Sequence, residues 1–139
     1  FLIMVFFQVQ ILAQNEKSTK YIDSKGEVII IPNGDISFAD KVVEFETGSY
    51  TTIIEGFKGL NPNNTLGPPD YTKKQTNEEC TTLGCGGSII LEFIDNAIID
   101  VNGYDIFVFE VGQIERSSIS ISKDLKDWIE VGEIKGGTA

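Results

Sequence analysis

The stretch that decides the fold is Ser118-Ile119-Ser120-Ile121-Ser122, in which small polar and apolar residues alternate strictly. A period of two places one set of side chains on a buried face and the other set in water, which is typical of a half-buried β-strand. After a short polar turn, Trp128-Ile129-Glu130-Val131-Gly132-Glu133-Ile134 alternates again. The two segments therefore predict two strands joined by a hairpin-like turn.

Other short apolar runs are bounded by Gly, Asn, Asp and Pro in the same way, and no window carries a sustained helical stripe. These runs lie at residues 28–31, 42–46, 88–94 and 106–111. Short strands at regular spacing with this punctuation predict an all-β fold, an antiparallel β-sandwich or jelly roll.

The composition excludes several classes of function. The chain has 139 residues, with 11 Lys and Arg against 21 Asp and Glu, a formal net charge of −10, and no histidine. Binding to nucleic acid needs a basic face, which argues against that partner. Without histidine the commonest general base and transition-metal ligand are missing, and no nucleophile–base set can be named. We therefore predict a protein that is not an enzyme. A hydrolase acting through paired carboxylates is the weakest alternative, because no pair can be singled out among 21 acids.

Residues 1–13 carry no charge and are mostly apolar. They are too few for a membrane-spanning helix, which needs about 20 residues. We interpret them as the remnant of a secretory signal ending at Ala13, the alternative being a buried strand. The predicted organisation is then a signal remnant at 1–13, a lead-in with the first strand at 14–33, and a sandwich module at 34–139. The mature chain is expected to be exported, to the periplasm, outer membrane or cell surface, with no transmembrane span.

Cys80 and Cys85 are the only cysteines, within Cys-Thr-Thr-Leu-Gly-Cys. Export permits disulfides, and two cysteines five apart can close a tight loop if the backbone bends enough. The spacing is not that of a Cys-x-x-Cys redox pair or a zinc site. A local disulfide and two thiols both fit the sequence.

Oxygen-bearing side chains gather in one predicted turn between strands. Asp95, Asn96, Asp100, Asn102 and Asp105 fall within eleven residues. Calcium takes six to eight oxygen ligands, so Asp95, Asp100 and Asp105 are the first choices for a calcium site. The spacing does not match an EF-hand loop. The alternative is that Asp and Asn stand there only as turn residues.

The region 56–79 lacks any apolar run of strand length and holds three of the four prolines. We predict a long loop, which is either a functional loop or a surface excursion capping one end of the sandwich. Asp70 follows Gly67-Pro68-Pro69, where two prolines restrict the backbone, so its carboxylate is held for a cation, a sugar hydroxyl or its own turn.

The aromatic residues divide between strands and loops. Trp128 stands at an apolar position of an alternating segment, which predicts core packing. Tyr71 and Tyr104 lie in predicted loops, and we expect them to be free to contact a ligand.

A family resemblance rests on three groups of residues. The first group is Gly34-Asp35-Ile36-Ser37-Phe38-Ala39-Asp40-Lys41-Val42-Val43 with Leu66-Gly67-Pro68-Pro69-Asp70-Tyr71. The second is Leu83-Gly84-Cys85-Gly86-Gly87-Ser88-Ile89-Ile90-Leu91-Glu92-Phe93, which leads into Asp95-Asn96. The third is Asp105-Ile106-Phe107-Val108-Phe109-Glu110-Val111-Gly112 with Ile119-Ser120-Ile121-Ser122-Lys123-Asp124 and Trp128-Ile129-Glu130-Val131-Gly132. Together they resemble an extracytoplasmic β-sandwich module of bacterial cell-surface proteins. It is similar to modules ahead of the peptidoglycan-binding domain in some OmpA-like outer-membrane proteins, and to discoidin-type, galactose-binding-like jelly rolls.

The resemblance implies a non-catalytic binding or adhesion module for an envelope or extracellular ligand, with a structural calcium near one end. It would make Asp70, Asp95, Asp105 and Glu110 the acidic positions for calcium. Members of the family run on beyond the equivalent of residues 136–139, so we expect a sandwich that is incomplete at its C-terminus. Glycan recognition is the leading expectation. The alternative is a structural spacer domain without a small-molecule ligand.

Overall fold

The computed structural model describes residues 18–23, 25–49, 59–70, 80–100, 102–103, 105–110 and 116–134. The predicted signal remnant at 1–13 lies outside these residues. The described part contains six strands and two 3-10 turns. In chain order they are β1 (Thr19–Ile22), β2 (Val28–Ile31), η1 (Gly34–Ser37), β3 (Lys41–Glu46), η2 (Pro62–Thr65), β4 (Ser88–Glu92), β5 (Ser117–Ile121) and β6 (Ile129–Ile134).

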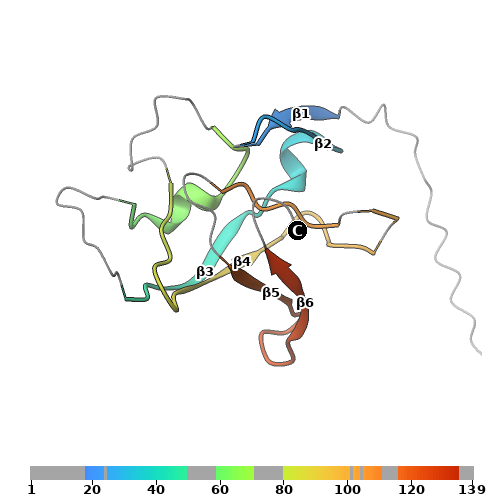
Figure 1. Cartoon of the computed structure of the whole chain (residues 1–139). Helices are drawn as coiled ribbons and strands as arrows, with labels where there is room; N and C mark the ends of the chain where they lie inside the picture. The colour runs from blue at the N-terminus through green and yellow to red at the C-terminus, as the bar shows by residue number, and fades with distance from the viewer. Residues whose placement is uncertain are drawn as a thin grey trace, which may run out of the picture.

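The strands form three antiparallel pairs, β1–β2, β3–β4 and β5–β6 (Figure 1). The predicted all-β, antiparallel fold is confirmed. Each described sheet has two strands, so every ladder in this part of the chain joins a strand to one neighbour only. A two-stranded hairpin is only marginally stable alone in water, and each pair therefore depends on what its apolar face contacts.

The β1–β2 hairpin carries two of the most buried apolar side chains. Ile29 and Ile31 alternate along one face of β2 and are only 8% and 6% exposed. On β1, the ring of Tyr21 lies edge-on to Phe38 at 5.5 Å and to Phe109 at 6.0 Å between ring centroids. Edge-to-face contacts at these distances are favourable. Through Tyr21 the first hairpin is therefore packed against the segment that follows it, at Phe38, and against a segment distant in the sequence, at Phe109.

The β3–β4 hairpin has one apolar face. Val42 pairs with Leu91 and Phe45 with Ile89, and all four side chains are half-buried. A bulge between Val42 and Glu44 separates the two pairs, and it keeps both on the same face despite their odd spacing along β3. The predicted run at 88–94 ends earlier, at Glu92.

The β5–β6 hairpin shows the alternation that the sequence predicted. Ile119 and Ile121 on β5 are half-buried, whereas Ser118 and Ser120 are exposed. Ile134, paired with the first residue of β5, is only 3% exposed. A bulge between Ile119 and Ser120 shifts the register in the middle of the pair.

The described part of the predicted loop at 56–79 contains no strand and one 3-10 turn, η2. The Oδ1 atom of Asn61 accepts the backbone N–H of Asn63 at 3.2 Å, and Pro62 begins the turn. A capping Asn followed by Pro at the first position is the usual start of such a turn. The turn η2 lies against β3.

The strand predicted at 106–111 is wrong for residues 106–110, which are assigned to no strand; Val111 lies outside the described residues. Residues 106–109 form a continuous apolar run, and residues 106–110 are half-buried. A strand also needs backbone hydrogen bonds to a neighbouring strand, and the three described sheets are β1–β2, β3–β4 and β5–β6, none of which includes residues 106–110. An apolar run of this length indicates burial of the segment, but it does not show whether a neighbouring strand is available to pair with it.

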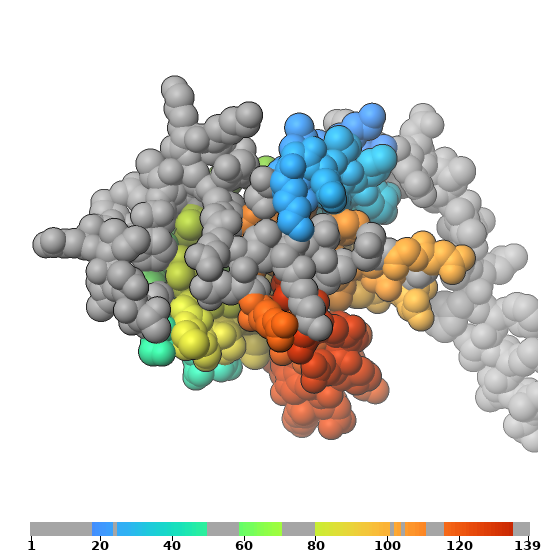
Figure 2. Space-filling model, in the orientation of Figure 1, coloured from blue at the N-terminus to red at the C-terminus, as the bar shows by residue number. Residues whose placement is uncertain are grey.

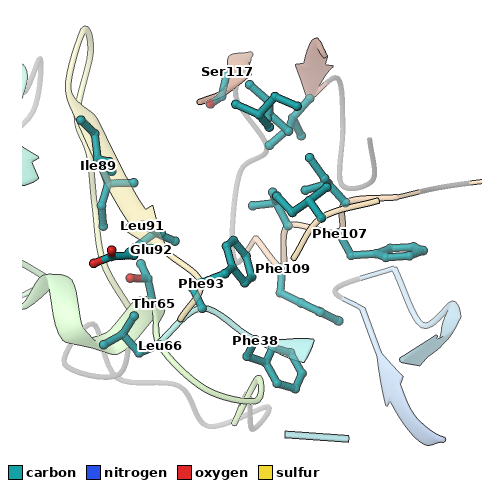
Figure 3. Close-up of a pocket in the computed structure, with 18 of the residues that line it drawn as sticks. Phe38, Thr65, Leu66, Ile89, Leu91, Glu92, Phe93, Phe107, Phe109 and Ser117 are labelled. Carbon is teal, nitrogen blue, oxygen red and sulfur yellow. The ribbon is translucent and has the colours of Figure 1, made fainter. Parts of the chain in front are cut away.

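An open cavity of about 2210 Å³ lies between the hairpins, and it is lined by residues from all three. In Figure 3 the side chains of Phe38, Phe93 and Phe109 lie around this space, and they come from three segments far apart in the sequence. Small-molecule pockets measure roughly 300–1,000 Å³. The cavity is about twice the upper value, so we interpret it as the space between the hairpins and not as a ligand pocket.

Candidate functional site

The turn that joins β5 to β6 is held by its own side chains. The Ser122 Oγ atom accepts the backbone N–H groups of Asp124 at 3.3 Å and Leu125 at 3.0 Å, and it donates to Asp124 Oδ1 at 3.2 Å. The same Oδ1 atom accepts the N–H groups of Lys126 and Asp127, each at 3.0 Å. Ser and Asp form such local bonds because their short side chains reach nearby backbone amides. The residues between the strands therefore have a defined conformation.

The carboxylate of Asp124 is the charged centre of this turn. The N–H of Asp127, followed by that of Lys126, lowers the pKa of Asp124 below its ordinary value of 3.8. Amide hydrogens that point at an ionised carboxylate favour the charged form. Asp124 is therefore ionised at neutral pH.

Trp128 follows this turn directly and keeps 44% of its surface exposed. The prediction that it packs in the core is wrong. The ladder ends at the pair Ile121–Ile129, so Trp128 lies just outside it. Leu125, in the turn, is 55% exposed, and Asp127 is also exposed. Figure 2 shows this hairpin and its turn as a projection from the body of the molecule.

The predicted calcium ligands do not converge in the described structure. Asp95, Asp100 and Asp105 are all exposed. No three acidic, histidine or cysteine side chains in the described ranges form a group able to hold a metal ion. A calcium site at these positions stays a prediction.

The residues next to Asp95 are bound to the segment before β3. Asp40 Oδ2 accepts the backbone N–H of Ile94 at 2.6 Å, and the Asn96 side-chain amide donates to the carbonyl oxygen of Ile36. The first of these bonds explains why β4 ends at Glu92, since the N–H of Ile94 bonds to a side chain and not to a ladder partner. Asp40 was not singled out in the sequence, because no local pattern indicates a partner 54 residues away.

The remaining predicted site residues are dispersed. Asp70 is exposed at the end of the described loop, and Glu110 is half-buried in the segment 105–110. Tyr71 and Tyr104, the predicted ligand-binding tyrosines, lie outside the described residues.

Asp23 is a buried carboxylate that the sequence reading missed. It is 7% exposed, and its Oδ1 atom accepts the N–H groups of Lys25 at 2.9 Å and Glu27 at 2.7 Å. It therefore shapes the β1–β2 turn in the same way that Asp124 shapes the β5–β6 turn. The signal was present as Asp-Ser-Lys-Gly between two apolar runs, which is a turn composition.

The structure does not join Cys80 and Cys85 in a disulfide bond. Cys80 is half-buried and Cys85 is exposed. The pairing of these two residues stays a prediction.

No protein-family model, no curated protein and no solved structure matches this chain. The resemblance to galactose-binding-like modules therefore stays a prediction. Across the ranges that the structure describes, no helix has the length and apolar character needed to cross a membrane.

Proposed function

We propose that this chain is a non-catalytic, extracytoplasmic binding module of a bacterial envelope or cell-surface protein, and that it recognises a glycan through Trp128 and the turn before it. The observation that carries the proposal is the exposed indole of Trp128, which directly follows an ordered turn with two exposed acidic side chains. The proposed architecture is a galactose-binding-like jelly roll to which the three hairpins contribute.

The chemistry of such a surface suits a sugar. An indole offers a flat apolar face on which the C–H side of a pyranose ring can lie. Carboxylates accept hydrogen bonds from sugar hydroxyls, and the Asp127 side chain is exposed beside Trp128 in the sequence. The hydrogen bonds within residues 122–127 fix the backbone before a ligand arrives, which reduces the entropy lost on binding.

The expected affinity is low. At about 0.3 kcal/mol per heavy atom, a hexose of roughly 12 heavy atoms gains about 4 kcal/mol, which corresponds to a dissociation constant of roughly 1 mM. Titrations must therefore reach tens of millimolar monosaccharide, or use oligosaccharides that offer several rings.

The single tryptophan makes the test specific. Because the chain has only one Trp, its emission spectrum reports on Trp128 alone. Titration with galactose, glucose, N-acetylglucosamine and their oligosaccharides should give a saturable blue shift for at least one sugar. A glycan array with the same protein then ranks the ligands.

Matched variants locate the binding surface. Trp128→Ala should abolish binding measured by calorimetry, and Trp128→Phe should retain part of it. Ile129→Ala removes a neighbouring side chain that is 65% exposed and should leave binding unchanged. If no sugar in the panel produces a saturable change, the glycan proposal is wrong, and the spacer-domain alternative takes its place.

The second part of the proposal is that a calcium ion binds the acidic turn at 95–105. A calcium ion selective for the folded state, present at about 100 times its dissociation constant, would raise the free energy of unfolding by about 2.7 kcal/mol. Thermal unfolding with calcium, with magnesium and with chelator tests this. Asp100→Asn should reduce the calcium-dependent rise, and an equal shift with both cations would contradict a calcium site.

A further inference from the structure

The segment 80–87 connects two other parts of the chain, and we call it the clasp. On one side it is bound to the loop at 59–66. The bonds are Thr82 N–H to the Gly59 carbonyl at 2.7 Å, Thr81 Oγ1 to the Asn61 carbonyl at 2.7 Å, and Asn64 Nδ2 to the Cys80 carbonyl at 3.3 Å. These bonds join the loop to the first half of the clasp.

On the other side the clasp is bound to the end of β3. Gly48 N–H donates to the Leu83 carbonyl at 2.8 Å, and Ser49 and Cys85 exchange two backbone hydrogen bonds at 3.0 and 2.9 Å. The two backbones approach so closely that a Cβ on Gly48 would lie 2.1 Å from the Cys85 oxygen and 2.4 Å from the Gly87 nitrogen. The loop at 59–66 is thus connected to the β3–β4 hairpin through residues 80–87.

The two cysteines stand at the ends of the bonded part of the clasp. Residues 81–84 contain neither a turn nor a bend, although Gly84 has a positive φ of 74°, so the backbone between Cys80 and Cys85 does not fold back on itself. Five extended residues span about 16 Å. A disulfide needs Cα atoms within about 7 Å of each other. Joining these two cysteines therefore requires the segment to bend.

We propose that the clasp is redox-sensitive: with both thiols reduced it holds the loop at 59–66 on the β3–β4 hairpin, and a Cys80–Cys85 disulfide releases that loop. The bend would move Thr81 and Thr82, whose bonds to Asn61 and Gly59 lie between the cysteines. This inference concerns regulation of the fold and is independent of the proposed glycan surface.

The oxidation is a thiol–disulfide exchange with a small disulfide such as glutathione disulfide. The exposed Cys85 attacks as thiolate, forms a mixed disulfide and displaces one glutathione thiolate. Cys80, as thiolate, then attacks the Cys85 sulfur and displaces the second glutathione. Two protein thiols are oxidised, one glutathione disulfide is reduced to two glutathione thiols, and the two protons pass to these products.

Hydrogen exchange of the full chain, before and after treatment with glutathione disulfide, tests the proposal. Peptide mass spectrometry first identifies the intramolecular disulfide by the loss of two hydrogen atoms. The amides of Thr82 and Gly48 donate bonds within this connection, and their protection should fall by roughly tenfold or more. The amide of Asp40, bonded to the Glu92 carbonyl at 2.9 Å, is the control and should not change.

Cys80→Ser and Cys85→Ser supply matched controls, because each leaves one thiol and cannot form the internal bond. Treated in the same way, both should keep the protection of Thr82 and Gly48. An internal disulfide that leaves this protection unchanged would overturn the proposal. So would the absence of any internal disulfide across a series of ratios of reduced glutathione to glutathione disulfide.

Discussion

The β3–β4 and β5–β6 hairpins have similar ladders but are held in different ways. Residues 47–87 separate β3 from β4, whereas only residues 122–128 separate β5 from β6. The ends of β3 and β4 are fixed by bonds between segments distant in the sequence: the Gly48 N–H donates to the Leu83 carbonyl, the Asp40 N–H to the Glu92 carbonyl, and the Ile94 N–H to the Asp40 carboxylate. The β5–β6 turn is fixed by Ser122 and Asp124, whose side-chain hydrogen bonds to described residues all lie within the turn.

The two hairpins should therefore respond to different substitutions. In the long-range hairpin the most sensitive position, Gly48, carries no side chain, because two backbones must approach closely there. In the local hairpin the sensitive positions are polar side chains that bond to nearby amides. Four substitution experiments test this contrast.

Gly48→Ala should have the largest effect. The added Cβ would lie 2.1 Å from the Cys85 oxygen and 2.4 Å from the Gly87 nitrogen, and both are backbone atoms that cannot rotate away. We expect a loss of about 3 kcal/mol in the free energy of unfolding, at the upper end for overpacking. Urea denaturation monitored by circular dichroism measures it.

Gly132→Ala is the matched control in the other hairpin. A Cβ at this position on β6 meets no atom within 4 Å, and alanine loses less backbone entropy on folding than glycine. We expect a change of less than about 1 kcal/mol, in the stabilising direction. Equal denaturation midpoints for the two variants would show that the crossing at Gly48 is not as close as described.

Asp124 gives the second largest effect, and its effect depends on pH. Its pKa is lower in the folded hairpin than the ordinary value of 3.8, so the ionised form is the one that stabilises the turn. The contribution is complete above that ordinary value and is lost as the pH falls through the lower pKa of the folded state. The amide shifts of Lys126 and Asp127, followed by NMR during acid titration, should therefore move below about pH 4.

Asp124→Asn tests the charge separately from the acceptor. The amide retains an Oδ1 atom for the N–H groups of Lys126 and Asp127 but does not titrate. We expect the hairpin to form with weaker bonds, and the acid-dependent shifts of these two amides to disappear. If the shifts persist in the variant, another carboxylate is responsible for them.

The contrast also explains which parts of the fold the sequence could predict. Alternation at 118–122 and the polar turn after it lie close together in the chain, so the β5–β6 pair was predictable. The runs at 42–46 and 88–94 predicted two strands but could not indicate that they pair, since pairing depends on contacts over more than 40 residues. The same limitation made the expected strand at 106–111 wrong for the described residues 106–110.

For the candidate site, the sequence indicated which residue types form turns and strands, but it did not indicate which side chains are exposed or which segments they contact. It predicted a turn at 122–127 but placed Trp128 in the core, because alternation does not show where a ladder ends. The acidic residues at 95–105 were grouped by their proximity in sequence, whereas the described bonds at the start of this segment are those of the Ile94 N–H to the Asp40 carboxylate and of the Asn96 side-chain amide to the Ile36 carbonyl. Turn composition alone cannot distinguish a turn whose acidic side chains converge on a metal ion from a turn that is bound to another segment of the chain.

Leu125→Gly should stabilise the local hairpin. Leu125 adopts a left-handed backbone conformation with φ of 62°, which costs a non-glycine residue about 1 kcal/mol. Its side chain is 55% exposed, so little packing is lost, and part of the gain is offset by the greater freedom of glycine in the unfolded chain. We expect a net gain of about 0.5 kcal/mol in urea denaturation.

Asn33→Gly is the control for the gain in the free energy of unfolding expected from Leu125→Gly. Asn33 has a similar φ of 60°, but asparagine tolerates this conformation better than leucine does. The gain should therefore be smaller at Asn33 than at Leu125. A larger gain at Asn33 would mean that the backbone at Leu125 is not strained.

The smallest effect concerns the ion pair between Lys41 and Glu92, whose Nζ and Oε2 atoms lie 2.9 Å apart across the β3–β4 ladder. The side chains are 59% and 47% exposed, so water and salt screen their attraction. A double-mutant cycle with Lys41→Ala and Glu92→Ala should give a coupling of about 0.3–0.5 kcal/mol at low salt, falling towards zero at about 1 M salt. A coupling above about 2 kcal/mol would be the value of a buried pair, and it would mean that another part of the protein covers this end of the long-range hairpin. The same cycle therefore measures whether the β3–β4 hairpin is fixed by its backbone crossing, as we infer, or by side-chain charges at its edge.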